Sequence, residues 1–298
     1  MKEKTSISRK IFVVCNYTIL TAFAVICLLP FLHVLCASFS DPYYVMKSEG
    51  LIWRIKDFTL EGYKIVLSNM NIWRGYLNTI FYCIGSTAIG MFITITGAYV
   101  ASRKDFLFHN TLSLFVAVTM LFVAGTIPNY MVVKSLHMYN TVWSVMIPGC
   151  FSVFNMIMLR TAFSSVPNAL AESAKLDGAG HLTIMFRIMV PLSRATIAVL
   201  IMYSVIGQWN SWFNASIYLR DPDKYPLQLV LRQILLQHQS TGSIASATSA
   251  SDLAYDTSVY DELVQYCSIV VAMLPIMIGF PFVQKYFAKG VMLGAVKE

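Results

Sequence analysis

Long apolar runs separated by shorter polar segments make up most of this chain. Six runs reach or approach the roughly 20 apolar residues that a helix needs to cross a bilayer. They are about Ile11–Ala37, Leu77–Ala101, Thr111–Val133, Thr141–Leu159, Ala195–Leu219 and Cys267–Val283. None shows the two-residue alternation of a half-buried strand, and a helix pairs its backbone polar groups inside lipid. The pattern predicts an all-α integral membrane protein with six transmembrane helices.

The composition agrees with this pattern. Apolar residues make up 57% of the chain, charged residues 12%, and the mean hydropathy is +0.62, whereas soluble domains carry about 25% charged residues. The first run is too long for a signal peptide and lacks a cleavage site after it, so we expect a retained helix. The predicted parts are an N-terminal tail (1–10), a membrane domain (11–287) with outer loops 38–76 and 220–262 and an inner loop 161–193, and a C-terminal tail (288–298).

The basic residues predict the orientation, because cytoplasmic loops are enriched in Lys and Arg. If the N-terminus is cytoplasmic, most of the 22 basic residues and few of the 15 acidic residues lie inside. Both termini and the loop 161–193 are then cytoplasmic, and the protein is a multi-pass protein of the cell membrane. Topology accounts for the net charge of +7, so we expect no nucleic-acid partner.

Small residues within the apolar runs are predicted to serve packing. The cysteines have no CxxC spacing and lie in or beside the spans, so we expect neither a disulfide framework nor a metal site; they are Cys15, Cys27, Cys36, Cys83, Cys150 and Cys267. Gly85, Gly90 and Gly97 permit close helix approach. Their partner is predicted to be either another helix of this chain or a second membrane subunit.

The inner loop has the pattern of two short helices joined at a corner. Ser164 or Ser165 can cap the first helix, and Pro167 suits its first turn. Gly178 permits a backbone conformation that other residues resist, and Asp177 is predicted to cap a second helix over 181–189, which Pro191 ends. The predicted apolar side consists of Leu170, Ala174, Phe186 and Ile188. On these residues alone, the loop either docks on a partner or rests on lipid headgroups.

A resemblance favours the docking partner. The letters ESAKLDG, followed nine residues later by IMVP, are similar to the EAA loop of permease subunits of ABC importers, and the form LDGA with PLS resembles the sugar-importer branch. Ser173 and Val190 depart conservatively from that pattern. The residues Gln208-Trp209-Asn210 with Phe213, and the ending QKYFAKGVMLGAVKE, also resemble sugar permeases.

The resemblance implies a coupling function and an assembly. The loop would insert into a cleft on a separate ATP-hydrolysing subunit through Glu172, Ser173, Ala174, Asp177, Gly178, Ile188 and Pro191. The implied partners are a second permease that forms a heterodimer with this chain, two ATPase subunits and an external solute-binding protein. No cofactor is expected on this chain, since ATP and Mg would bind the ATPase.

The chain carries no evident energy source of its own. The cores of the predicted spans contain no Asp, Glu, Lys or Arg, and ion-coupled carriers normally place such groups at membrane depth. There is also no GxxxxGK[ST] phosphate loop. A secondary transporter is therefore a weaker alternative. An intramembrane enzyme would need HExxH, GxSxG or paired aspartates, which are absent from the spans, so we expect no catalytic residues.

A polar cluster in the fifth run is the predicted cargo path. Amides and aromatic faces suit sugar hydroxyls and rings, and here they are Gln208, Trp209, Asn210, Trp212 and Asn214. Any single amide could instead form a hydrogen bond between helices; Asn155 and Tyr203 are further polar residues in the spans. We expect a carbohydrate cargo, an oligosaccharide, since DPDKYPLQ and GVMLGAVK resemble a subgroup handling complex, some pectin- or alginate-derived, oligosaccharides. The alternative is an importer permease for a solute other than sugar.

Overall fold

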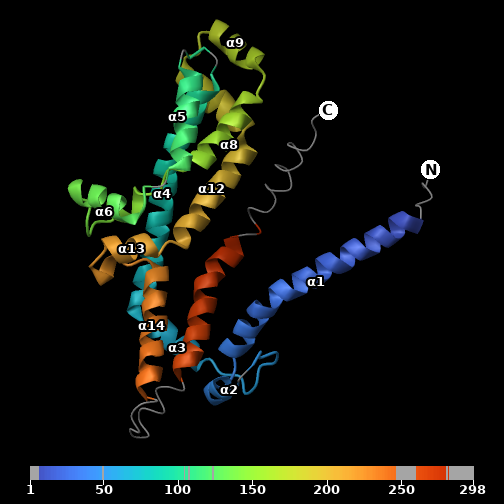
Figure 1. Ribbon diagram of the computed structural model, residues 1–298, viewed down its shortest axis with the longest axis vertical. Coiled ribbons are helices and arrows are strands. Elements are labelled where there is room, and N and C mark those ends of the chain that lie inside the picture. The colour runs from blue at the N-terminus through green and yellow to red at the C-terminus, as the bar shows by residue number, and fades with distance from the viewer. Residues whose placement is uncertain are drawn as a thin grey trace. The chain divides into compact units, whose positions relative to one another are not determined.

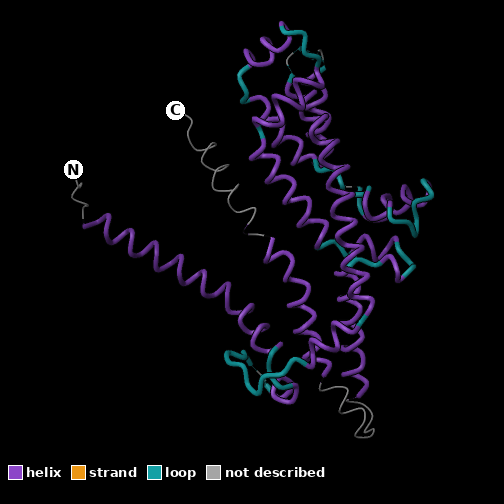
Figure 2. The backbone as a smooth tube through the Cα atoms, turned by 180° about the vertical axis from the view of Figure 1, so that it is seen from behind, coloured by secondary structure: helices purple, strands orange, loops and turns teal. Residues whose placement is uncertain are grey.

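The computed structural model describes residues 7–48, 50–103, 105–106, 108–122, 124–245, 260–279 and 281. These residues form helices, turns and loops and no strand, which confirms the all-α prediction (Figures 1 and 2). The α-helices are α1 (Ile7–Ser38), α2 (Pro42–Lys47), α3 (Glu61–Ser68), α4 (Met70–Ser102), α5 (His109–Leu121), α6 (Thr126–Ser135), α7 (Trp143–Met146), α8 (Val153–Ser164), α9 (Asn168–Leu176), α10 (His181–Ile184), α11 (Val190–Leu192), α12 (Arg194–Trp209), α13 (Phe213–Tyr218) and α14 (Leu227–Ala245). A π-helical turn covers Met185–Met189, a 3₁₀ turn covers Pro222–Lys224, and the last described helix is Tyr260–Gly279.

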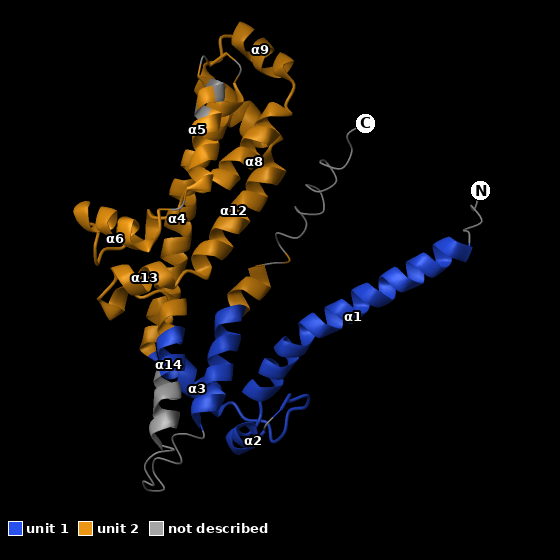
Figure 3. Ribbon diagram, in the orientation of Figure 1, with its two compact units in different colours: residues 1–69, 231–273 blue, residues 70–230, 274–298 orange. Residues whose placement is uncertain are grey.

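The chain divides into two compact units, which Figure 3 shows in separate colours. The first unit comprises residues 1–69 and 231–273, and the second comprises residues 70–230 and 274–298. The second unit contains α4 to α13 and therefore both the loop 161–193 and the fifth apolar run.

Three helices are long and apolar enough to cross a membrane: α1, α4 and Tyr260–Gly279. Two bent pairs raise the number of candidate spans among the described residues to as many as five. The helix Ser113–Leu121 meets Thr126–Ser135 at 118°, and His181–Leu192 meets Arg194–Trp209 at 85°. The first, second and sixth predicted spans thus coincide with long helices, although Phe280, Phe282 and Val283 lie outside the described residues.

The prediction of continuous helices was wrong for the other three runs. The run 111–133 is interrupted before α6, where Gly125 has φ +80°. The run 141–159 contains α7 and the first part of α8, separated at Pro148 and Gly149, and Gly149 has φ +83°. The run 195–219 breaks between Trp209 and Phe213. At the first two breaks, a glycine in the left-handed region, or a proline without an N–H, ends the regular hydrogen-bond ladder.

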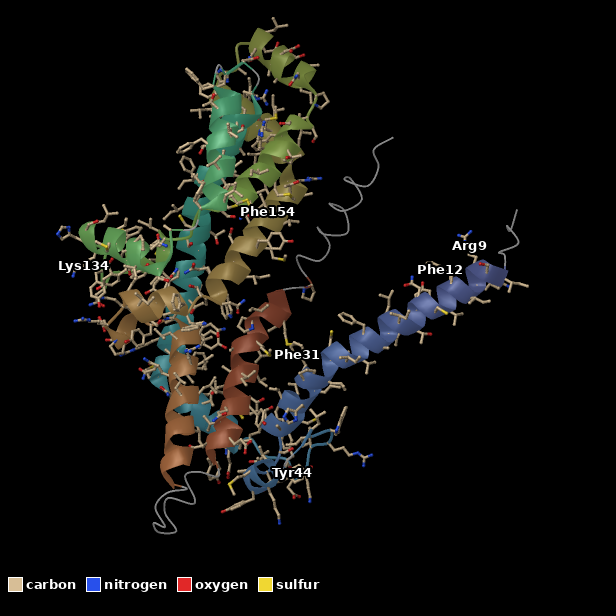
Figure 4. All side chains as sticks on the ribbon, viewed as in Figure 1. Arg9, Phe12, Phe31, Tyr44, Lys134 and Phe154 are labelled. Atoms are coloured by element: carbon tan, nitrogen blue, oxygen red, sulfur yellow. The ribbon has the colours of Figure 1, made fainter. Side chains whose placement is uncertain are left out.

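Helix α1 is apolar on all sides and exposed along most of its length. Residues 7–28 are all exposed, and Phe12 and Phe31, labelled on this helix in Figure 4, are 69% and 42% exposed. A helix that is hydrophobic all round requires an apolar environment. Lipid or another protein subunit must therefore cover α1.

In the first unit, the C-terminal end of α1 contacts α3, the segment that follows α1 and the last described helix. Tyr63 donates a hydrogen bond to Ser38 Oγ (2.8 Å), and the Cys267 thiol contacts the Ser38 carbonyl (3.4 Å). The Ile52 N–H donates to His33 Nδ1 (2.9 Å), whose ring also meets Tyr266 edge to face. His33 therefore serves packing and loop attachment.

In the second unit, α4 packs against α5, α8 and α12, which run beside it in Figure 1. Much of the buried core of this unit lies between these helices and the loop 161–193; its members include Ala98, Tyr99, Met156, Leu159, Phe163 and Leu200. Gly90 allows a close approach of two backbones, because a Cβ atom there would lie 2.0 Å from the Cys150 carbonyl oxygen. The predicted glycine contacts are thus made within this chain, since Gly85 and Gly97 face Met146 and Met156.

The opposite end of α4 is fastened to the segment that precedes α14. Thr79 Oγ1 accepts from the Leu227 N–H (2.8 Å), and Tyr82 donates to the Lys224 carbonyl (2.8 Å). Asn140 joins this end, since its side-chain oxygen accepts from the Arg220 N–H (3.0 Å). The two halves of α4 are therefore tied to different segments, one at residues 224–227 and the other at residue 181.

Gly90→Ala should destabilise the second unit. The new methyl group would overlap a backbone oxygen, and overpacking of this kind costs about 1–3 kcal/mol. We expect a lower midpoint of thermal denaturation for the purified protein in detergent. Gly207→Ala is the matched control, because Gly207 also lies in a helix but a Cβ there meets nothing within 4 Å. Equal midpoints for the two variants would contradict the close contact at Gly90.

Candidate functional site

The loop 161–193 (the docking loop) contains helix α9, which ends in a defined cap. Pro167 is the N-cap residue of α9 and provides no side-chain hydrogen bond. Ser164 belongs to α8 and Ser165 follows it, so the predicted serine cap was wrong. At the other end, the Ala179 N–H donates to the Ala174 carbonyl (2.8 Å) and the Gly178 N–H donates to that of Lys175 (3.0 Å). This pair of bonds is a Schellman motif.

Gly178 forms the corner of the loop. Its φ is +81°, a conformation that costs an L-residue with a side chain roughly 1–2 kcal/mol. The predicted backbone conformation is therefore confirmed. Asp177, in contrast, is the C-cap of α9, whereas Gly180 is the N-cap of α10, so the predicted cap of the second helix was wrong.

The second part of the docking loop runs from α10 through the π-helical turn and α11 to a sharp bend. Pro191 lies in α11 and is exposed. It has no N–H to donate to the Arg187 carbonyl, and the widened turn Met185–Met189 lies directly before it. The helix bends by 85° around Ser193 and continues as α12. The loop is therefore joined to α12 through an irregular backbone.

The docking loop buries one face and exposes the other. Ala171, Ile184, Met185 and Met189 are buried in the core, and Ala174 and Ile188 pack against it. Of the predicted coupling residues, Glu172, Ser173, Asp177 and Gly178 are exposed. The predicted apolar side was wrong at Leu170 and Phe186, which are 45% and 47% exposed. The helix phase explains this error, because Ala171 rather than Leu170 faces the core.

Two leucines on the exposed face were missed by sequence reasoning. Leu176 is 90% exposed and Leu182 is 70% exposed. They flank the corner at Gly178, where a polar turn would be the ordinary choice. These leucines add exposed apolar surface beside the exposed Glu172 and Asp177.

Polar contacts fix the docking loop to the end of α4 and to the turn that follows it. Lys175 Nζ lies 2.6 Å from Asp105 Oδ2. The hydrogen bond and charge of Lys175 hold the pKa of Asp105 below its ordinary value, which favours the charged carboxylate. Tyr99 and His181 share a hydrogen bond between the phenol oxygen and Nδ1 (3.2 Å).

A polar cavity of about 520 Å³ lies at the breaks in the predicted fourth and fifth helices. Its lining contains hydroxyl, amide and aromatic groups and no charged side chain; the residues are Ser86, Pro148, Gly149, Cys150, Ser152, Phe154, Asn155, Tyr203, Ser204, Gly207, Gln208, Ser211 and Asn214. Figure 4 labels Phe154, at the start of α8. Uncharged hydrogen-bonding groups can bind a neutral polyhydroxyl molecule.

The cavity separates the predicted cargo-path residues into two groups. Gln208 and Asn214 line it, whereas Trp209, Asn210 and Trp212 do not. Trp209 is buried and contacts the Tyr76 ring at 6.1 Å between centroids. Asn210 Nδ2 donates to the Ile206 carbonyl one turn earlier in α12 (3.0 Å). Trp212 meets Phe213 edge to face.

Several residues of the cavity were not predicted as cargo-path residues. Asn155 and Tyr203 stand out in the sequence only as polar residues within apolar runs, and the serines have no separate signal. These residues converge because α4, the start of α8 and the end of α12 pack together. Among the described residues, no group of three His, Cys, Asp or Glu side chains could hold a metal ion.

Comparisons with known proteins cover nearly the whole chain. The family described as "Binding-protein-dependent transport system inner membrane component" matches residues 4–293. The polygalacturonan/rhamnogalacturonan transport system permease protein YtcP of Bacillus subtilis (strain 168) is 36% identical over 97% of this chain and 99% of its own length. Protein LplC of the same organism is also 36% identical, over 97% of this chain and 95% of its own.

A solved structure shows the same fold. It is a crystal structure of a bacterial ABC transporter involved in the import of the acidic polysaccharide alginate, and one of its chains matches with a TM-score of 0.82. That chain is 28% identical to this one, with 95% of this chain and 99% of the other covered.

The corner of the docking loop gives a prediction that depends on geometry alone. Gly178→Ala should strain the left-handed residue and open the end of α9, so that the amide of residue 179 exchanges about 5- to 30-fold faster. Hydrogen exchange measured by mass spectrometry would detect this. Gly180→Ala is the control, because φ at Gly180 is −73° and a Cβ there meets nothing within 4 Å. Equal exchange in both variants would rule out strain at Gly178.

Proposed function

Because the chain belongs to the family of inner membrane components of binding-protein-dependent transport systems, we propose that it is the membrane-spanning permease subunit of an ATP-driven ABC importer for carbohydrate. The observation that carries the proposal is the docking loop, in which a buried apolar face fixes a corner and an exposed face presents Glu172, Leu176 and Leu182. Permease relatives over almost the full length support it.

The docking loop is the contact with the ATPase in this proposal. Glu172, Ser173, Asp177 and Gly178 lie on its exposed face together with the two leucines, whereas Ala174 and Ile188 attach it to the core. Pro191 stands before the bend into α12. ATP and Mg bind the ATPase subunits, and this chain holds no cofactor and is not itself an enzyme.

The complete importer contains further subunits. Two ATPase subunits bind the docking loops, and an external solute-binding protein delivers the cargo. A second, different permease completes the path in this proposal. This chain lines its own part of the path with residues of α4, α8 and α12 and of the breaks between them. The exposed apolar surface of α1 suits both lipid and such a second permease.

The proposed topology is six spans in the cytoplasmic membrane with both termini and the docking loop inside. Two contacts support a crossing by the broken fourth run. Lys224 donates to the Asn140 carbonyl and accepts through its own carbonyl from Tyr82 of α4, whereas the docking loop contacts Tyr99, nearer the other end of α4. From Tyr82 to Ala101, α4 rises about 28 Å, close to the roughly 30 Å of a hydrocarbon core. The membrane domain covers 11–287 between the tails 1–10 and 288–298, and the C-terminal tail lies outside the described residues.

The proposed cargo is an oligosaccharide, and the polar cavity is its path through this subunit. The hydroxyl and amide lining supports this reading, as do relatives named for polygalacturonan, rhamnogalacturonan and alginate. Gln208 and Asn214 are the predicted residues that face the cargo. Trp209, Asn210 and Trp212 do not line the cavity.

Transport then follows from alternating access. The loaded binding protein docks outside, and ATP binding closes the ATPase pair. The docking loops move with it, and their attachment to α4 and α12 turns the cavity outward. The cargo enters, and hydrolysis returns the cavity to the inner side. Neutral groups in the cavity release the cargo again because each hydrogen bond contributes only about 1 kcal/mol.

Leu176→Glu should uncouple the importer. A carboxylate at a residue that is 90% exposed leaves this chain folded but places a charge in the contact with the ATPase. In the reconstituted complex we expect loss of ATPase co-purification or of cargo-stimulated ATP hydrolysis. Glu172→Lys should act likewise. Lys134→Glu, on α6, is the control for a surface charge change. Parent-like stimulation in Leu176→Glu would argue against docking through this face.

Gln208→Ala and Asn214→Ala should each lower transport about fivefold, since the loss of one hydrogen bond of about 1 kcal/mol corresponds to that factor. Uptake of labelled oligogalacturonides into proteoliposomes would measure it. Asn210→Ala is the control, because Asn210 does not line the cavity. Equal uptake in all three variants would contradict the cargo path. Stimulation by an amino-acid-loaded binding protein alone would instead favour a permease for another solute.

A further inference from the structure

We propose that the end of α4 and the turn after it, residues 99–103, 105 and 106, form a brace that positions the docking loop and carries its displacement to the polar cavity. Tyr99 and Asp105 are the positioning residues. This inference rests on the proposed function, since it assumes that the docking loop receives its motion from the ATPase.

Three elements attach to the brace. From α8, Arg160 Nε donates to the Ala101 carbonyl (3.1 Å), one of the carbonyls that a helix end leaves without an internal partner. From α10, His181 Nδ1 lies 3.2 Å from the Tyr99 hydroxyl. From α9, Lys175 Nζ lies 2.6 Å from Asp105 Oδ2. Both helices of the docking loop are therefore attached to the same short stretch of chain.

Apolar packing attaches the docking loop to the brace, whereas polar contacts fix its orientation. Ala98, Tyr99 and Ala101 are buried together with residues of the docking loop, including Ala171 and Ile184. This packing attaches the loop but is not directional. The hydrogen bond at Tyr99 and the ion pair at Asp105 are directional, so they fix the register of α9 and α10 against α4.

The Lys175–Asp105 pair adds little to stability. The two side chains are 42% and 69% exposed, and exposed ion pairs are weak because water and salt screen them. Tyr99 is different, since its ring is buried and carries the Arg103 guanidinium 4.9 Å from its centre. Loss of these polar contacts should therefore change the position of the loop far more than the stability of the protein.

Helix α4 connects the brace to the cavity without interruption. Ser86 lines the cavity, and from Ser86 to Tyr99 the helix rises about 20 Å. No proline lies within α4. The other connection, through α12, passes the π-helical turn Met185–Met189 and the 85° bend. An uninterrupted helix is stiffer than one with a widened turn and a sharp bend, which assigns the transmission to α4.

The test uses the full importer complex in proteoliposomes and measures cargo molecules transported per ATP hydrolysed. Asp105→Asn and Tyr99→Phe each remove one polar contact and keep the side-chain size, and we expect at least a threefold fall in this ratio. Asp105→Lys combined with Lys175→Asp restores the ion pair with reversed charges, and the ratio should recover. Asp223→Asn is the matched control, because Asp223 pairs with Arg74 near the other end of α4.

Parent-like ratios for both Asp105→Asn and Tyr99→Phe would overturn the brace, as would failure of the charge-reversed pair to recover. If Asp105→Asn prevents assembly of the complex, the cargo-to-ATP ratio of the variant with Asp105→Lys and Lys175→Asp tests the brace instead. The parent complex distinguishes failure of the proposed function from failure of the brace. If its ATP hydrolysis does not respond to loaded binding protein, the proposed function fails, whereas a responsive parent with unaffected variants removes the brace alone.

Discussion

Backbone polar groups inside a bilayer must find partners, and this requirement organises the second unit. Continuous helices meet it within themselves, and irregular backbone is tolerated at membrane depth only inside protein or beside a water-filled cavity. The breaks near Pro148 and Ser211 fit that rule, because residues of both breaks line the polar cavity. The interruptions in two predicted helices and the presence of a polar path are therefore one structural feature.

The docking loop is attached to the core by one face and leaves its other face exposed for contact with a partner. Its Schellman cap places Ala174 and Ala179 toward the core while Leu176 and Asp177 stay outside. Because Gly178 turns the chain within one residue, α9 and α10 can both reach α4. A longer or flexible corner would let the exposed face move without moving the helices beneath it.

Sequence patterns predicted the long helices and the conformation at Gly178, because both depend on local chemistry. They did not predict the helix breaks, since an apolar run has the same composition whether its helix continues or stops. They also could not separate Gln208 and Asn214 from Asn210, because the break at 210–212 changes the helical phase. The caps at Pro167 and Gly180 were missed for a related reason: tertiary packing, rather than side-chain capping, fixes where these helices start.

The described residues that line the cavity carry no charge, which has a consequence for the proposed transport. A cation in this wall would bind an acidic sugar strongly, because charge-assisted hydrogen bonds are roughly twice as strong as neutral ones. The sugar would then remain bound when the cavity changes sides. Neutral amides and hydroxyls such as Asn155, Gln208 and Ser204 can hold a sugar and exchange it for water at small cost. Under the proposed function, strong selection belongs to the external binding protein, and weak contacts suit the passage through this subunit.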